Sequence, residues 1–184
     1  MDRITQMTAT WQDKIFKNFD KAAYIYNENA DLQKDIAWKL AKLCQRHFIP
    51  KGIWVDLGTG TGLLANSLEQ LNPDQSVIRV DSSKKMIELN TSKNHNILWD
   101  LNQGLPKFKN TPNLLASSFV LHWLRNPADR LQEWFNALDS GGWIALSLPI
   151  EGSFKEWHQA AAKANVGCTA LELPSKESII NTIK

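Results

Sequence analysis

The stretch Val55-Asp56-Leu57-Gly58-Thr59-Gly60-Thr61-Gly62 decides the fold of this chain. It joins a short apolar run, Ile53 to Leu57, to a segment with Leu64, Leu68 and Leu71 at helical spacing. Glycines let the backbone turn tightly and approach a ligand closely, and the helix that follows begins with free N–H groups. We therefore predict a strand, a tight turn and a helix, with the turn at the edge of a sheet where α/β proteins bind ligands.

The same alternation of strand and helix signals continues along the chain. Short apolar runs predict further strands, and amphipathic spacing predicts the helices between and before them. The further strands are expected over residues 76–80, 96–99, 113–119 and 143–148, and the other helices over 31–48, 83–91 and 127–138. Alternating elements of this kind predict an α/β fold with five parallel strands and helices on both faces of one sheet.

Composition narrows the class of protein. The 184 residues are 43% hydrophobic, which suits one domain with a buried core. The net charge of +2 is too small to indicate nucleic acid binding, and the longest apolar stretch, Trp143 to Ile150, is too short to span a membrane. Cys44 and Cys168 form no C-x-x-C pair and the four histidines show no metal-binding spacing, so we expect no disulfide and no metal. These features favour a cytoplasmic protein.

Three aspartates stand at the ends of the first three predicted strands. Asp56 would repel a pyrophosphate but attract a cationic ligand group. Asp81 is placed to accept hydrogen bonds from both hydroxyls of a ribose. Asp100, with Leu101 beside it, suits the amine and the apolar face of an adenine. Each aspartate alone could be a turn residue or a helix cap, but the set predicts a nucleoside-type cofactor with a positively charged end.

The turn, together with VDSSKKM at 80–86 and WDL at 99–101, resembles the class I S-adenosylmethionine methyltransferases, which have a Rossmann-like sheet. The N-terminal run from Asn18 to Tyr26, and Leu121-His122-Trp123 after the fourth strand, resemble the malonyl-acyl-carrier-protein O-methyltransferases of biotin synthesis. The resemblance implies S-adenosylmethionine as cofactor. It also implies a single domain over 1–184, with a helical lid at 1–50, a cofactor-binding core at 51–150 and a helical acceptor-side segment at 151–184.

The resemblance also implies which residues hold the cofactor. Asp56, Gly58 and Gly60 would contact its methionine end, and the backbone carbonyl of Ser117, taken to end the fourth strand, would accept from its ammonium group. The remaining implied contacts are Asp81 and Ser82 for the ribose, Asp100 and Leu101 for the adenine, and Gly62 and Met86 beside them.

Two residues are candidates for a part in the reaction. Tyr26 matches a tyrosine of the segment that closes over the cofactor in the similar enzymes, although a tyrosine there could equally pack a helix on the core. His122 is near the expected acceptor position, where it could orient a carboxylate, act as a base, or be a packed neighbour of Trp123.

The expected reaction is O-methylation of the free carboxylate of a malonyl thioester on acyl-carrier protein, which would be the partner. Alternatives are methylation of another small carboxylate or metabolite, and a module that binds the cofactor without catalysis. A nicotinamide enzyme is disfavoured because Leu63 stands where the dinucleotide motif has glycine. The similar enzymes have two more strands after the fifth, so we expect a truncated sheet whose exposed edge could pair with a second copy.

Overall fold

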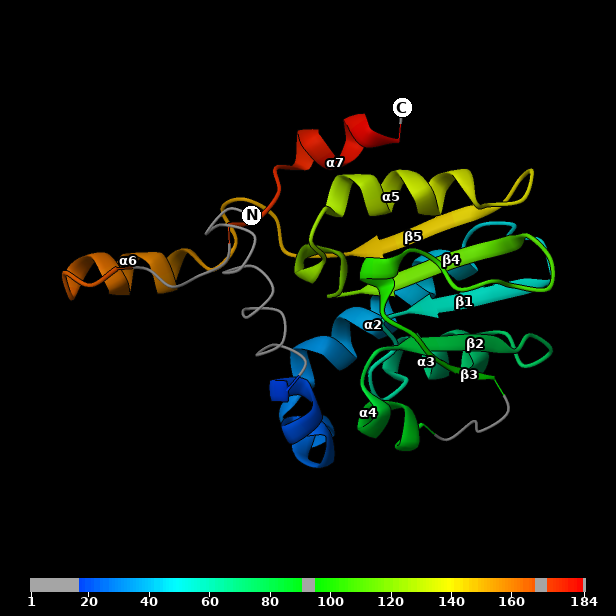
Figure 1. Cartoon of the computed structure of the whole chain (residues 1–184), viewed down its shortest axis with the longest axis horizontal. Helices are drawn as coiled ribbons and strands as arrows, with labels where there is room; N and C mark the ends of the chain where they lie inside the picture. The colour runs from blue at the N-terminus through cyan, green and yellow to red at the C-terminus, as the bar shows by residue number, and fades with distance from the viewer. Residues whose placement is uncertain (1–16, 91–94, 168–171, 184) are drawn as a thin grey trace.

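The computed structural model describes residues 17–90, 95–167 and 172–183, and its centre is one five-stranded sheet (Figure 1). The strands lie in the order β3-β2-β1-β4-β5, and every neighbouring pair is parallel. Their bounds are β1 (Ile53–Leu57), β2 (Val77–Asp81), β3 (Asn96–Leu98), β4 (Pro112–Ser118) and β5 (Trp143–Ser147). The predicted α/β, Rossmann-like architecture is confirmed.

One face of the sheet is covered by two helices, α2 (Asp31–Gln45) and α3 (Leu63–Leu71). Trp54, Val77 and Leu114 project from three neighbouring strands into this core and are buried. Successive side chains of a strand point to opposite faces of a sheet, so the residues next to these three along their strands point to the other face. Helix α2 was predicted over 31–48 and ends at Gln45, three residues earlier than expected.

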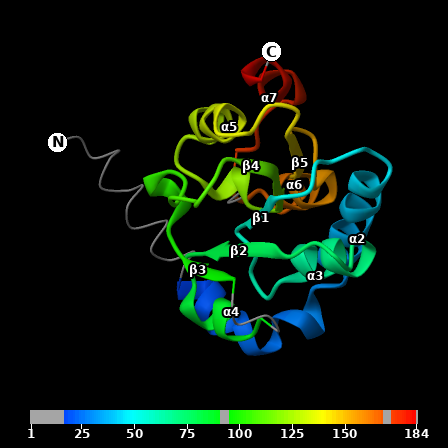
Figure 2. The ribbon, with the colours of Figure 1, turned by 90° about the vertical axis from the view of Figure 1, so that its right-hand side faces the viewer.

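The opposite face packs against α5 (Pro127–Asn136), with α7 (Lys176–Thr182) beside it (Figure 2). Val55 and Leu57 point to this side, and Trp134 of α5 is fully buried here. The sheet is thus a layer between two apolar cores, which fixes the positions of its strand ends.

The elements after the strands gather at one edge of the sheet. Here lie the short helix α4 (Lys84–Glu88) and two single-turn helices, η1 (Leu101–Gln103) and η2 (Leu121–Trp123). The helix predicted over 83–91 is shorter than expected, and the buried side chain of Asn90 beyond its end donates to the carbonyls of Met86 and Gly60. This edge carries the candidate site.

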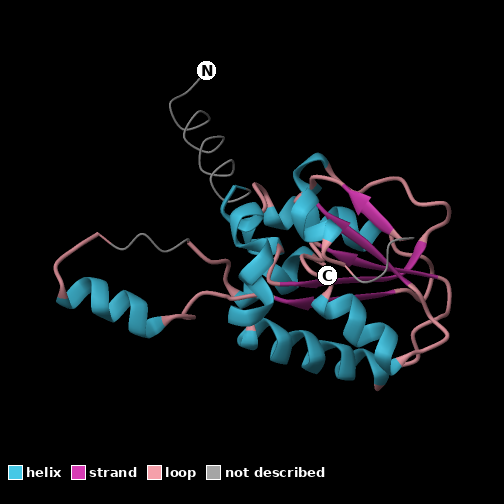
Figure 3. Cartoon of the chain, turned by 90° about the horizontal axis from the view of Figure 1, so that it is seen from below, coloured by secondary structure: helices cyan, strands magenta, loops and turns pink. Residues whose placement is uncertain are grey.

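Helix α6 (Lys155–Lys163) lies apart from the sheet, beyond the carboxyl ends of the strands (Figures 1 and 3). None of its residues is buried. Strand β5 is an edge of the sheet, and Trp143 at its start is exposed. Pairing of this edge with a second copy remains a prediction.

The N-terminal helical segment, residues 17–29, is attached to the turn after β1 and to the start of α4. Thr61 Oγ1 donates to Asn27 Oδ1 at 2.6 Å, and Ser83 Oγ donates to Asp20 Oδ1. The expected lid at 1–50 remains a prediction, and residues 1–16 of it lie outside the described residues. The division of the chain into lid, core and acceptor-side segments also remains a prediction.

The described ranges lack two kinds of feature. No described helix is long and apolar enough to cross a membrane. The same residues contain no cluster of three or more His, Cys, Asp or Glu side chains placed to hold a metal ion.

Candidate cofactor site

The glycine turn bends back from β1 towards the end of β2. The backbone N–H groups of Gly58 and Thr59 donate to the carbonyl of Val80 at 2.8 and 2.9 Å. Gly58 and Gly60 have φ angles of +71° and +55°, in the left-handed region that glycine adopts without steric cost. The turn therefore presents backbone, without side chains, to the space above the strand ends.

Asp56 lies beneath this turn and not in the space above it. Its Oδ2 accepts hydrogen bonds from Thr59 Oγ1 at 2.8 Å and from the N–H of Ala65 at 3.0 Å, and the residue is 1% exposed. Burial raises the pKa of this carboxyl to about 6, against the opposing hydrogen bonds from Thr59 and Ala65. Asp56 thus ties the turn to α3, and the predicted contact with the cofactor remains a prediction.

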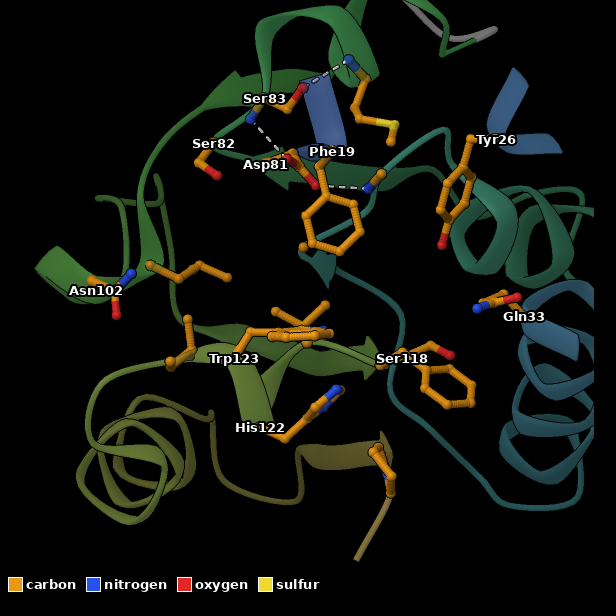
Figure 4. A pocket seen from close by; sticks show the side chains of 18 of the residues that line it. Phe19, Tyr26, Gln33, Asp81, Ser82, Ser83, Asn102, Ser118, His122 and Trp123 are labelled. Carbon is orange, nitrogen blue, oxygen red and sulfur yellow. Dashed lines mark hydrogen bonds between the residues drawn. The ribbon is translucent and has the colours of Figure 1, made fainter. Parts of the chain in front are cut away.

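Asp81 is held from two sides at the end of β2. Its Oδ2 accepts from the N–H of Gly60 at 2.7 Å, and its Oδ1 accepts from the N–H of Ser83 at 2.8 Å (Figure 4). Burial raises the pKa of Asp81, although these two hydrogen bonds lower it in part. Each carboxylate oxygen can accept more than one hydrogen bond, so both remain able to bind hydroxyl groups of a ligand.

A cavity of about 530 Å³ opens above the strand ends, within the range of small-molecule sites. It is lined by segments from across the chain, including the helical segment 17–29, the glycine turn, η1 and η2. The predicted site residues that line it are Tyr26, Gly58, Gly60, Asp81, Ser82, Met86, Asp100, Leu101 and His122. The structure brings these residues of distant segments together.

Gly62 and Ser117 do not line the cavity. A Cβ at Gly62 would lie 2.3 Å from Asn90 Oδ1, so this glycine permits close packing at the start of α3. Ser117 is 2% exposed and donates through Oγ to the carbonyl of Leu57 at 2.8 Å. The prediction that Ser117 ends the fourth strand is wrong by one residue, because pairing continues to Ser118, which lines the cavity.

Helix η1 and the aspartate before it form a further part of the cavity wall. Asp100 Oδ1 accepts from the backbone N–H and the side-chain amide of Asn102, both at 2.9 Å, and so caps this short helix. Leu101 and Met86 are almost completely buried where they border the cavity. Asp100, Leu101 and Met86 thus give the lining one acidic and two apolar side chains.

Aromatic side chains that were not predicted as site residues form much of the remaining wall. Phe19 and Trp123 meet edge to face with ring centroids 6.0 Å apart (Figure 4). Phe119 also lines the cavity, meets His122 edge to face with ring centroids 6.5 Å apart, and has a φ of +58°, a rare conformation for a residue with a side chain. A sequence signal for Phe19 existed, because it precedes Tyr26 by seven residues and so shares its face of the helical segment.

Two titratable side chains border the aromatic wall. Burial raises the pKa of the Tyr26 phenol, and the charge of Asp81 raises it further, so its hydroxyl stays protonated near neutral pH. His122 is 8% exposed, and burial lowers its pKa to about 4. Its Nδ1 is buried and has no hydrogen-bond partner among the described residues. His122 is therefore a neutral imidazole, and Figure 4 shows its ring directed into the cavity.

Comparison with known proteins agrees with this geometry. The family model described as a methyltransferase domain matches residues 26–180. The chain is 28% identical over 158 residues to the malonyl-[acyl-carrier protein] O-methyltransferase of Marinomonas sp., covering 82% of this chain and 57% of that protein. It is 32% identical over 111 residues to the trans-aconitate 2-methyltransferase of Mycobacterium tuberculosis, covering 60% of this chain and 41% of that protein. The chain thus spans about half the length of such curated relatives.

Solved structures share the fold at lower identity. A possible histamine N-methyltransferase from Thermotoga maritima superposes with a TM-score of 0.63 at 21% identity, covering 90% of this chain and 76% of that one. The plantazolicin methyltransferase in complex with S-adenosylhomocysteine superposes with a TM-score of 0.59 at 13% identity, covering 98% of this chain and 71% of that one. The strand order, the glycine turn with its strand-end aspartates, and the match over residues 26–180 lead to one conclusion: this chain belongs to the class I S-adenosylmethionine-dependent methyltransferase domain family.

Proposed function

We propose that this chain transfers the methyl group of S-adenosylmethionine to a carboxylate oxygen, and that the acceptor is a malonyl thioester on acyl-carrier protein. The observation that carries the proposal is Asp81, whose two oxygens are fixed by Gly60 and Ser83 while they face a cavity of suitable size. The similarity to malonyl-[acyl-carrier protein] O-methyltransferases supports the choice of acceptor.

The cavity supports a binding role for each of its walls. Asp81 would accept hydrogen bonds from the ribose hydroxyls, and Ser82 would donate one to them. The backbone of Gly58 and Gly60 would lie along the methionine end of the cofactor. Asp100 would accept from the adenine amine, with Leu101 and Met86 against the ring. Asp56 would act on the cofactor through the turn that it holds, and its direct contact with the methionine end remains a prediction.

The cofactor supplies a methyl group on a good leaving group, so the protein has to bind, orient and exclude water. Orientation of two bound reactants can contribute effective molarities of about 10⁵ to 10⁸ M. The aromatic side chains Phe19, Phe119 and Trp123 would exclude water from the reacting atoms. A carboxylate acceptor is already ionised at neutral pH and needs no base. His122 can therefore serve as a neutral hydrogen-bond donor that orients the acceptor.

The proposal is tested by incubating the chain with S-adenosylmethionine labelled in its methyl group and with malonyl-acyl-carrier protein. We expect label on the carrier-bound malonyl group in a base-labile ester. Free malonate and trans-aconitate, offered at the same concentrations, address the alternative of a small carboxylate acceptor. Equal transfer to a free acid would reject the carrier-bound acceptor, and saturable cofactor binding without any transfer would indicate a non-catalytic module.

The pH profile distinguishes a positioning role of His122 from a role as base. Because its pKa is about 4, His122 does not titrate between pH 6 and 8. We expect kcat for the carboxylate acceptor to have the same pH dependence in the wild-type chain and in His122→Gln, which keeps an N–H donor. An inflection near the ordinary histidine pKa that vanished in His122→Gln would show that His122 is the base.

The two glycines of the turn are expected to respond differently to alanine. A Cβ at Gly58 would lie 2.3 Å from Val120 Cγ2, so Gly58→Ala should lower the free energy of unfolding by about 1 to 3 kcal/mol, the usual cost of overpacking. A Cβ at Gly60 meets no atom within 4 Å, and Gly60→Ala should cost only about 1 kcal/mol for its left-handed backbone. Yet Gly60 lines the cavity, so its variant should lose cofactor affinity. Urea denaturation and calorimetry measure the two effects, and unaltered affinity in Gly60→Ala would contradict the role of this backbone.

A further inference from the structure

A second cavity, of about 900 Å³, adjoins the first one. The two share His122, His158 and Leu173 as lining residues, so these three side chains stand at the junction. The second cavity is formed mainly by the segments that follow β5, namely the loop 151–153, helix α6 and residues 172–178. This gives a structural role to α6, which has no buried residue and does not support the core.

The side chains around the second cavity are mostly polar. Hydroxyl and amide groups come from Ser153, Gln159, Ser175 and Ser178. Such groups both donate and accept hydrogen bonds without carrying charge. The second cavity can therefore form hydrogen bonds with an uncharged, polar chain.

The charged residues of both cavities are mainly acidic. Asp81 and Asp100 line the first cavity, Glu151 and Glu172 line the second, and Lys155 is the one lysine or arginine among the described lining residues. Bound S-adenosylmethionine, with two positive groups and one negative, would offset part of the charge of the first pair. A ligand with several carboxylates would still lie near Glu151 and Glu172, and like charges at short range repel one another.

Of the two histidines at the junction, His122 is the buried one, and its ring is directed into the first cavity. His122 is more than nine-tenths buried and its Nδ1 has no partner among the described residues, an arrangement that costs free energy unless a ligand provides one. Trp123, Phe154 and Trp157 line the first cavity near the shared residues. A reacting group that passed the junction would thus meet the imidazoles of His122 and His158 beside these aromatic side chains.

We propose that the second cavity is the access channel for the acceptor, and that it takes an elongated molecule with a single carboxylate at its reacting end. The uncharged, hydrogen-bonding body of this molecule lies between α6 and residues 172–178, and His122 holds the carboxylate at the junction. The inference rests on the proposed methyl transfer and goes beyond it, since it assigns the acceptor site and excludes free tricarboxylates as good acceptors.

The test compares two tryptophan variants of the same exposed helix. Gln159 faces the second cavity, whereas Ala160 is turned from it by about 100° and does not line it. Calorimetry on the chain saturated with S-adenosylhomocysteine uses two probes, a malonyl thioester with a short amide-containing tail and free trans-aconitate. We expect Gln159→Trp to weaken binding of the thioester at least about tenfold and Ala160→Trp to change it less than about twofold. Both variants should bind S-adenosylhomocysteine as the wild-type chain does.

Each outcome bears on one part of the proposal. Failure of the folded wild-type chain to bind S-adenosylhomocysteine would reject the proposed function itself. Cofactor binding with equal thioester affinity in the two variants would reject the channel alone. Trans-aconitate binding as tight as that of the thioester, or no binding of the thioester at all, would reject the single-carboxylate, elongated acceptor.

Discussion

Asp81→Ala is expected to weaken binding of S-adenosylmethionine by at least about 100-fold. A hydrogen bond to a charged group contributes about 1.5 to 3 kcal/mol, and the variant would lose two such bonds to the ribose, which together amount to about 3 to 6 kcal/mol. It would also lose the acceptors of the Gly60 and Ser83 N–H groups, now 2.7 and 2.8 Å away, and so loosen the turn that lies along the methionine end. Calorimetric titration with S-adenosylhomocysteine measures the loss.

Two further variants sharpen this experiment. Asp81→Asn has nearly the same shape, but its amide would place a donor against a backbone N–H, because both oxygens of Asp81 act as acceptors. We therefore expect it to bind little better than Asp81→Ala. Asp74→Ala is the matched control, since this exposed aspartate has only a distant ion pair with Lys51 at 3.9 Å. Affinity of Asp81→Ala close to that of Asp74→Ala would refute the ribose assignment.

Arg79→Met is expected to lower the free energy of unfolding by at most about 3 to 5 kcal/mol, the cost of removing one partner of a fully buried ion pair, because the Glu69 carboxylate left behind is only partly buried. Arg79 is completely buried behind α3, where its guanidinium donates to both carboxylate oxygens of Glu69 at 2.7 and 3.1 Å. It also donates to Asn66 Oδ1 at 2.9 Å and to the carbonyl of Val77 at 2.9 Å. Methionine fills much of the volume but satisfies none of these acceptors.

The comparison variant is Arg130→Met, which removes a partly exposed ion pair with Glu133 and should cost about 1 kcal/mol or less. Burial would raise the pKa of Glu69, but the hydrogen bonds from Arg79 and from the Val77 N–H outweigh it and lower that pKa below 4.5. The stability that Glu69 contributes is therefore present above pH 4.5 and is lost as the pH falls through the lowered value. Urea denaturation should show that the difference in free energy of unfolding between the wild-type chain and Arg79→Met becomes smaller in acid. If Arg79→Met and Arg130→Met lowered the free energy of unfolding equally at pH 7, the prediction would be contradicted.

The sheet could be predicted from sequence because its signals are local. The apolar run Ile53–Leu57, the glycines after it and the repeated strand and helix patterns each depend on residues close in sequence. Asp81 and Asp100 were predicted to lie near each other by the same logic, because parallel strands end at one edge of a sheet. The end of β4 was misplaced by one residue because it depends on pairing with Ser147.

The rest of the site depends on contacts between distant segments. Phe19 and Trp123 touch although about a hundred positions separate them in sequence, and no local pattern predicts such a pair. For Asp56, the sequence pattern predicts that the residue lies on the strand. It does not predict where the carboxylate points, because that direction is set by the N–H of Ala65 in the next helix. The second cavity is likewise formed by loops and helices after β5, whose placement has no periodic signal.

The attachment of the helical segment 17–29 has a kinetic consequence. Two side-chain hydrogen bonds, Thr61 to Asn27 and Ser83 to Asp20, join it to the turn and to α4, while Tyr24 and Ile25 face solvent. Hydrogen bonds of this kind contribute about 0.5 to 1.5 kcal/mol each, so breaking both costs about 1 to 3 kcal/mol. Phe19 also packs edge to face on Trp123 and Ala23 is buried, so outward opening of the segment is rarer than these two bonds alone would allow. Exchange of product for fresh cofactor can then proceed through this local opening while the sheet stays intact.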